Sequence, residues 1–426
     1  MKVNGNYLGG SPGAARCGRI FSLTHSLTHS LTLRSLFLGI LIFFLALAPS
    51  AALAEITGAG TEENPYLISS AQDLADFRSK MLSYPSYRSA HVKLTQDIDL
   101  SNLQDAADGW TPIGTQYPFT GVFDGGGFTI SGLVINIESS SHSDVYAGLF
   151  GYVNDDTEFG GNRGVVKNVN VADAKINVTV TGNAYTCAGV IAGRCNGDII
   201  GCSTGGTVNV TTAAYSYNVG GIVGYIQNYG DVTDCENTAS IQVTETGNDY
   251  IYANVGGIAG YASNVNNIVN CKNGGTVTGG AKSYAGGIAG YFGYYNNYYE
   301  DENAYKAVTL NGCENSGEVT GNRAGGIAGQ ISNDVDEAAL VRLTNCTNSG
   351  DVNGIGDGSY AADIVGYIYD DSAVTLESCS AAGKVTGARE TATFGAIAGY
   401  LASLPAINAA PPPPRPRATH PPPPPS

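Results

Sequence analysis

Small and apolar residues recur in a fixed block along the chain, and Gly256-Gly257-Ile258-Ala259-Gly260-Tyr261 is its clearest copy. Eight copies lie between Leu149 and Tyr400, and the last glycines of successive copies are 30 to 42 residues apart. An aliphatic residue always stands two positions before that glycine. A tyrosine follows it in six copies, with Arg194 and Gln330 as the exceptions. Repeats of this length predict a solenoid, a propeller or an array.

A second block accompanies the first and keeps stricter offsets. It has an aliphatic residue three positions before a cysteine, a small residue four positions after it and a branched aliphatic residue six positions after it. Four copies also have asparagine two positions after the cysteine. The six cysteines are Cys202, Cys235, Cys271, Cys313, Cys346 and Cys379. The spacing of three between aliphatic residue and cysteine predicts a bend with both side chains turned inward.

These blocks predict a parallel β-solenoid. They are rich in β-branched residues and glycine, which favours strands over helices. A unit of about 30 residues cannot bury its own core, so stacked copies share one. We expect glycine and asparagine after each block to supply positive φ at corners, and asparagines to bond from rung to rung. The inward ladder is expected to contain the six cysteines together with Ile222, Ile258, Ile288 and Ile327. A propeller needs four strands per repeat, and only two or three can be found.

The residues before the repeats predict a cap. Ser69-x-x-Gln72 predicts a capping box for an amphipathic helix that ends near Met81. A strand is expected from His91 to Leu100. A solenoid needs its first rung covered, and this segment is placed to cover it.

Composition indicates export. The chain of 426 residues has 58 glycines and a net charge of −16, which argues against nucleic acid and anionic membranes as partners. An apolar run at 36–48 precedes an Ala-x-Ala signal ending at Ala54, which predicts a secretory signal region at 1–54 and no transmembrane segment after cleavage. Residues 404–426 form a proline-rich tail.

A series of motifs now carries a family resemblance. Gly58-x-Gly60-Thr61, Leu94-Thr-x-Asp97-Ile-Asp-Leu100, Trp110-x-Pro-Ile-Gly114 and Ala147-Gly-Leu-Phe-Gly-Tyr152 resemble the N-terminal module of bacterial surface proteins with GLUG repeats. The later copies resemble the GLUG motif itself. The resemblance implies an all-β, right-handed parallel β-helix, with a small α+β cap and first coils at 55–145 and GLUG-type repeats at 146–403. It also implies an extracellular or bacterial cell-surface location and adhesin-like behaviour.

The same repeats occur in the M26 family of IgA-specific metallopeptidases. None of the five histidines of this chain lies in His-Glu-x-x-His. The protease activity therefore does not carry over, and we expect no catalytic residue and no metal ligand.

Candidate binding residues lie in the longest linker, between Gly290 and Cys313. It contains Tyr294, Tyr295, Tyr298 and Tyr299, and flat rings with polar tips suit contact with sugar or protein. A loop packed on the solenoid flank is the alternative. Acidic clusters follow several copies of the first block and would lie along one edge of a solenoid. We expect no cofactor, although calcium is conceivable there because carboxylate oxygens suit it.

The cysteines could be free thiols or could form disulfide bonds, and the sequence leaves both interpretations open. One cysteine per coil at a fixed position indicates small buried thiols, because parallel inward side chains suit a disulfide dihedral poorly. Cys187 and Cys195 bracket one expected strand and cannot pair with each other, whereas a bond between Cys195 and Cys202 stays open.

The sequence therefore predicts a non-enzymatic surface repeat protein that binds a host or microbial glycan or protein through coil-edge loops. The alternatives are a carbohydrate-active β-helix enzyme, a lyase or glycosidase, and a non-catalytic module of a larger surface protein. A β-helix enzyme would need paired carboxylates in a coil that departs from the repeat, and no coil departs in that way.

Overall fold

The computed structural model describes residues 56–103, 109–157, 162–227, 230–247, 252–264, 267–294, 307–333, 341–369, 374–387, 393–395 and 397–401. These residues belong to one compact unit. The predicted signal region at 1–54 and the proline-rich tail at 404–426 lie outside the described residues.

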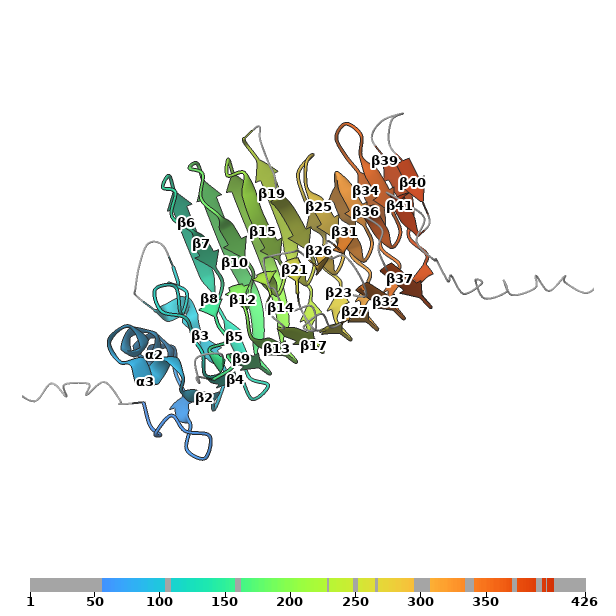
Figure 1. The fold of residues 1–426 in the computed structure, drawn as a ribbon. Helices are drawn as coiled ribbons and strands as arrows, with labels where there is room; N and C mark the ends of the chain where they lie inside the picture. Colours follow the sequence, from blue (N-terminus) through green and yellow to red (C-terminus); the bar gives the residue numbers. More distant parts are fainter. Residues whose placement is uncertain are drawn as a thin grey trace, which may run out of the picture. The chain divides into compact units, whose positions relative to one another are not determined.

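The unit is a parallel β-helix built from four stacked sheets (Figure 1). One coil contains β17 (Asp231–Thr233), β18 (Glu236–Asn237), β19 (Ser240–Glu245), β20 (Tyr252–Gly256) and β21 (Ala259–Ser263). Each of these strands pairs in parallel with its counterpart in the next coil. The expected parallel solenoid is confirmed, but the expectation of two or three strands per repeat is wrong, because strands of two or three residues leave little periodic signal.

Sheet A holds the strands that enter each coil. Its ten strands are β1 (Tyr66–Ile68), β2 (His91–Leu94), β4 (Val122–Asp124), β9 (Val165–Lys167), β13 (Asp198–Ile200), β17, β22 (Asn267–Val269), β27 (Val308–Asn311), β32 (Val341–Thr344) and β37 (Val374–Glu377).

Sheet B follows after the cysteine bend and has fifteen strands. They are β3 (Ile98–Asp99), β5 (Thr129–Ser131), β6 (Val134–Ser139), β10 (Asn170–Val180), β14 (Ser203–Thr212), β18, β19, β23 (Lys272–Asn273), β24 (Val277–Thr278), β28 (Glu314–Asn315), β29 (Val319–Gly321), β33 (Thr347–Asn348), β34 (Val352–Gly354), β38 (Ser380–Ala381) and β39 (Val385–Gly387).

Sheets D and C complete each coil with eight strands each. Sheet D contains β7 (Val145–Ala147), β11 (Thr186–Ala188), β15 (Ser216–Gly220), β20, β25 (Tyr284–Gly286), β30 (Arg323–Gly325), β35 (Tyr360–Ala362) and β40 (Thr393–Gly395). Sheet C contains β8 (Phe150–Val153), β12 (Ala192–Cys195), β16 (Val223–Ile226), β21, β26 (Ala289–Tyr294), β31 (Ala328–Asn333), β36 (Val365–Tyr369) and β41 (Ala398–Leu401).

The core is a set of columns that run through successive coils. Ile258 stands between β20 and β21 and is fully buried, as are its counterparts Ile222, Ile288 and Ile327. In sheet A, Val232 of β17 pairs with Ile268 of β22, and Ile268 pairs with Leu310 of β27, and all three side chains are buried. Equivalent side chains therefore lie one above the other and remove each other from water.

The N-terminal end is covered by α2 (Ala71–Ser83), and the short α3 (Pro85–Arg88) follows. The buried face of α2 includes Leu74, Phe77 and Met81. The ring centres of Phe77 and Phe119 are 6.1 Å apart, and the two rings pack edge to face. The capping box is shifted by one residue from the expected position. Ser70 is the N-cap and accepts from the Asp73 amide, while Asp73 accepts from Ser69.

Two further expectations need correction. The strand expected from His91 to Leu100 is divided into β2, β3 and the 3₁₀ helix η1 (Leu100–Asn102). The positive φ angles expected after the blocks mostly precede the cysteine instead. The residues with φ between 53° and 65° at that bend are Gly201, Asp234, Asn270, Gly312, Asn345 and Ser378.

Candidate functional site

The six repeat cysteines form an inward column at the bend between sheets A and B. Five are buried and Cys379 is half-buried, and all eight described cysteines, including Cys187 and Cys195, are free thiols. The Cys271 thiol lies 3.4 Å from the Val269 carbonyl oxygen of its own coil and 3.4 Å from the Val232 carbonyl oxygen of the preceding coil. The column therefore combines small apolar volume with a weak donor for carbonyls at the bend.

A second column consists of buried asparagines. The side-chain amide of Asn237 donates to Asn273 (2.8 Å), Asn273 to Asn315 (2.8 Å), and Asn315 to Asn348 (2.6 Å). Each of these amides also donates to the carbonyl two residues later, as Asn273 does to Gly275 (2.9 Å). The expected rung-to-rung asparagine ladder is present, and it satisfies polar groups inside the helix.

The second glycine of the first block leaves the space that the asparagine side chains of this ladder occupy. A Cβ atom on Gly257 would stand 2.3 Å from Cγ of Asn273 and 2.1 Å from the Gly287 carbonyl oxygen. Gly221, Gly287 and Gly326 meet the following asparagine in the same way. The two sequence blocks therefore contact each other across neighbouring coils.

The tyrosines that follow the first block stack along sheet C. The rings of Tyr225 and Tyr261 are 5.0 Å apart and those of Tyr261 and Tyr291 are 4.5 Å apart, with interplanar angles of 1° and 10°. Arg194 occupies the same register, with its guanidinium 4.9 Å from the Tyr152 ring and 5.3 Å from the Tyr225 ring. Its planar charged group replaces one ring of the stack through cation–π contact.

The structure places one of the four candidate binding tyrosines. Tyr294 is the last residue of β26, is 4% exposed, and its carbonyl accepts from the Tyr291 hydroxyl at 3.1 Å. A side chain buried to this degree offers little surface to a ligand. Tyr295, Tyr298 and Tyr299 lie outside the described residues.

The acidic clusters all fall in connections from a strand of sheet C to the next strand of sheet A. Only Asp155 and Asp156 of these clusters are described. Arg163 donates to Asp155 (2.5 Å) and makes two bonds of 2.8 Å to Asp198. Burial alone would raise the pKa of Asp155, but hydrogen bonds from Thr157 and the Arg163 charge hold it below its usual range.

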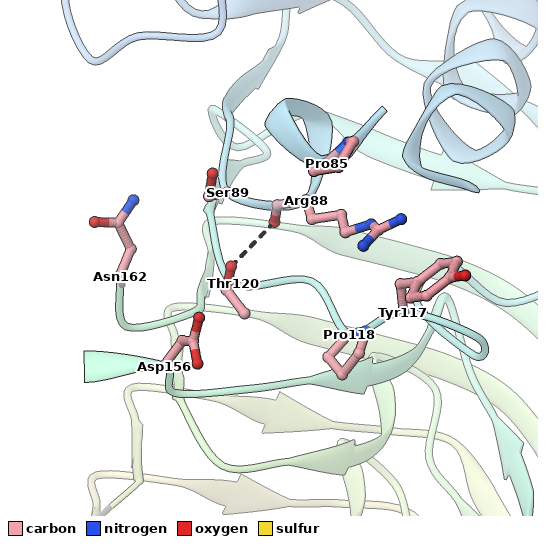
Figure 2. Close-up of a pocket in the computed structure, with 8 residues that line it drawn as sticks. All are labelled: Pro85, Arg88, Ser89, Tyr117, Pro118, Thr120, Asp156 and Asn162. Atoms are coloured by element: carbon pink, nitrogen blue, oxygen red, sulfur yellow. Dashed lines mark hydrogen bonds between the residues drawn. The ribbon is translucent and has the colours of Figure 1, made fainter. Parts of the chain in front are cut away.

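A cavity of about 520 Å³ lies where the cap meets this edge (Figure 2). It is lined by Pro85, Arg88, Ser89, Tyr117, Pro118, Thr120, Asp156 and Asn162. The Arg88 guanidinium lies 3.6 Å from the Tyr117 ring centre, and its Nε donates to the Met81 carbonyl at 3.0 Å. The Thr120 amide donates to the Arg88 carbonyl at 2.8 Å and so fixes the cavity wall.

A second cavity of about 530 Å³ lies on the outer face of sheet B. A β-bulge in β10, between Val171 and Ala174, accompanies it, and Asp173 at the bulge has a φ of 53°. Thr129, Asn170, Ser203 and Glu236 also line this cavity. Val171 and Ala172 add apolar surface to the lining, which contains no aromatic ring.

Neither cavity is foreseen from the sequence. The lining of the first comes from four segments that stand up to 77 residues apart, from Pro85 to Asn162. Tyr117-Pro118 directly before the buried Phe119 is the only local signal, because an aromatic and a proline beside a core residue indicate an exposed turn.

The chain carries the GLUG motif, whose family model matches residues 215–242. That stretch contains one copy of each block, with Ile222 and Cys235 in the inward columns, so the resemblance seen in the sequence is confirmed.

Two relatives match parts of the chain. A "Putative Gly-rich membrane protein" from Evansella cellulosilytica is 35% identical over 138 residues, which is 30% of this chain and 14% of the relative. "Halomucin" from Haloquadratum walsbyi is 33% identical over 182 residues, which is 42% of this chain and 2% of the relative. The matches thus span small fractions of much longer proteins.

Among solved structures, a "putative immunoglobulin A1 protease" from Bacteroides ovatus aligns with 83% of this chain and 76% of its own, at 20% identity and a TM-score of 0.36. Similarity at this level says nothing about function. In the described part of the chain, no helix has the length and apolar character needed to cross a membrane.

Proposed function

We propose that the protein is a surface-exposed, non-enzymatic repeat protein that binds a glycan or protein through the connections from sheet C to sheet A. One observation carries this proposal. The inward columns hardly change from coil to coil, while these connections vary from 2 residues between β12 and β13 to 13 between β26 and β27. Variable connections on a rigid scaffold are where binding residues concentrate.

The relatives support a location at the cell surface. One is described as a membrane protein and the other as halomucin, and both are far longer than the matched segments. The secretory signal region that the sequence predicts at 1–54 agrees with an extracellular position. The acidic net charge of −16 keeps an elongated, glycine-rich repeat soluble outside the cell.

Binding is tested with the purified chain on glycan and protein arrays. A variant with Tyr295, Tyr298 and Tyr299 changed to serine removes the candidate contacts and retains Tyr294, which belongs to β26. Tyr215→Ser, at a tyrosine that is 41% exposed and lies between β14 and β15, is the matched control. We expect the triple variant to lose binding and the control to keep it. A wild-type chain that binds nothing on either array would refute the proposal.

The absence of catalysis is tested separately. The chain is incubated with pectin-like and mucin polysaccharides, and new reducing ends or unsaturated products are measured. We expect none, and cleavage of either polymer would overturn the non-enzymatic assignment in favour of a lyase or glycosidase.

A further inference from the structure

The tyrosine row along sheet C is interrupted in two coils, and an arginine side chain lies at both interruptions. At the first, Arg194 itself stands in register between Tyr152 and Tyr225. At the second, Gln330 takes the place of the tyrosine. Arg323, from the neighbouring sheet D, reaches across and donates to the Gln330 side chain. A guanidinium therefore accompanies each departure from the repeat.

The two guanidinium groups differ in their partners. Arg323 has the Gln330 oxygen as a fixed acceptor. Arg194 makes no ion pair in the part of the chain that the structure describes, although the chain has 37 acidic residues. Arg163, by contrast, makes two bonds of 2.8 Å to Asp198. A half-buried charge without a counterion retains much of its desolvation cost, so a ligand that supplies the counterion would gain affinity there.

The Arg194 guanidinium is held in one orientation. The Tyr152 ring lies 4.9 Å from it on one side and the Tyr225 ring 5.3 Å from it on the other. Its Nε is buried while the side chain as a whole is half-buried, which leaves the terminal nitrogens for a ligand. A planar fork fixed in this way matches a carboxylate with two parallel hydrogen bonds, and its rigidity lowers the entropy cost of binding.

Acceptors for hydroxyl groups lie beside this fork. The Tyr146 hydroxyl is next to the Arg194 guanidinium, and the Tyr146 and Tyr152 ring centres are 6.1 Å apart. The same hydroxyl donates to the carboxylate of Asp144, an exposed residue, at 2.8 Å. A carboxylate has several acceptor positions, so one bond leaves others available. A donor for a carboxylate and acceptors for hydroxyls are therefore neighbours on this surface.

We infer that Arg194 binds the carboxylate of an acidic sugar residue, a uronic acid, and that Tyr146 and Asp144 accept hydrogen bonds from hydroxyls of the same residue. An acidic side chain of a peptide offers a carboxylate without neighbouring hydroxyls and fits this arrangement less well. The inference goes beyond the proposed function, because the site lies on the outer face of sheet C and not in a connection.

The test uses three probes with the intact chain. The methyl glycosides of glucuronic acid and of glucose differ only by the carboxylate, and N-acetylglutamic acid α-amide represents an acidic peptide side chain. Saturation-transfer NMR detects weak binding, and titrations followed by NMR measure its strength. The variants are Arg194→Tyr, which restores the tyrosine of the other copies, and Arg194→Lys. Arg323→Tyr, at the other stacked guanidinium, is the matched control.

The glucuronic acid glycoside is expected to bind at least about tenfold more tightly than the glucose glycoside. Arg194→Tyr should weaken its binding at least about tenfold, and Arg194→Lys about threefold or more, because a point charge replaces the fork. Arg323→Tyr should bind as the unchanged chain does. Circular dichroism establishes that the variants are folded, and if Arg194→Tyr unfolds, Arg194→Lys decides the matter.

Three results would overturn the inference. The first is no binding of the glucuronic acid glycoside, and the second is unchanged binding by Arg194→Tyr. The third is equally tight binding of the glutamate probe, since the sugar hydroxyls would then contribute nothing.

The two proposals can fail separately. If Arg194→Tyr abolishes binding on the arrays and the triple tyrosine variant retains it, the acidic-sugar site stands and the proposed role of the connections fails. If only the triple tyrosine variant abolishes array binding and the glucuronic acid glycoside does not bind, the proposed function stands and the site at Arg194 fails.

Discussion

At the scale of single residues, the position before each cysteine bears the sharpest backbone constraint. Left-handed φ angles disfavour residues with a Cβ, and asparagine, aspartate and glycine tolerate them best. The chain uses those residue types there, together with one serine, Ser378. These residue types can be read from the sequence, but glycine and asparagine also follow the cysteine, so the predicted turn lay on the wrong side of it.

Replacing Asn345 tests that constraint. Asn345→Val puts a β-branched side chain at a φ of 55° and should lower the free energy of unfolding by about 1–2 kcal/mol. Asn345→Gly should leave it nearly unchanged. Urea unfolding followed by circular dichroism measures both, and equal stability of the two variants would contradict the assigned strain.

The buried asparagine ladder supplies a second residue-scale prediction. Asn273→Ala removes the bonds to Asn237, Asn315 and Gly275 and should cost about 3 kcal/mol, because polar groups are left buried without partners. Asn209→Ala, in the exposed asparagine row of sheet B, removes one outer bond of 3.1 Å and should cost about 0.5 kcal/mol or less. A similar loss for both would show that burial is not what matters here.

At the scale of elements, the inward columns could be predicted and the strand count could not. Fixed offsets placed Ile258 and the cysteines inside, since a ladder tolerates no insertion between its members. Short strands such as Glu236–Asn237 carry no such signal. Tyr294 was assigned to a loop because the tyrosines beyond it look alike, whereas β26 continues through it.

The stack along sheet C allows a prediction at Arg194. Its Nε is buried and has no hydrogen-bond partner among the residues that the structure describes, so the guanidinium retains a desolvation cost that a tyrosine would not have. Arg194→Tyr should therefore be as stable as the original chain or more stable. Arg194→Ala should lose about 1–2 kcal/mol through lost cation–π contact and packing. Thermal melting compares the two, and greater stability of the alanine variant would refute this account.

At the scale of the whole molecule, the buried thiols predict sensitivity to alkali. Burial raises the pKa of Cys187 and of Cys195 to about 12 from a usual 9.0. The folded state therefore favours the protonated thiols. Their stabilisation is complete below pH 9 and is lost progressively as the pH rises toward 12, at up to about 1.4 kcal/mol per unit for each thiol.

A double variant isolates that contribution. In Cys187→Ala/Cys195→Ala the urea midpoint should fall less between neutral and alkaline pH than in the original chain. Tyrosine ionisation also lowers the stability of both proteins at alkaline pH. Burial is the first cause of the raised pKa of Tyr185 and of Tyr225 and remains when the cysteines are replaced, whereas the smaller contribution of Cys187 to both is removed with it. Identical pH profiles would show that these two thiols do not ionise on unfolding.

The molecule as a whole could be predicted as a β-helix, but its cavities could not. Stacking follows from repetition, which the sequence displays. The cavity beside the cap depends on how α3, the turn at Tyr117-Pro118 and the turn at Asp156 meet, and those segments share no pattern. Features at junctions between non-repeating segments therefore become visible only in the structure.

Each inward column meets only the coil above and the coil below, so an extra coil copied from the middle would find compatible neighbours on both sides. Unequal recombination within the gene could lengthen or shorten the protein without redesigning its interior. Each such event would move the outermost turn by about 4.8 Å. Populations of the organism could then differ in the length of this protein by whole coils.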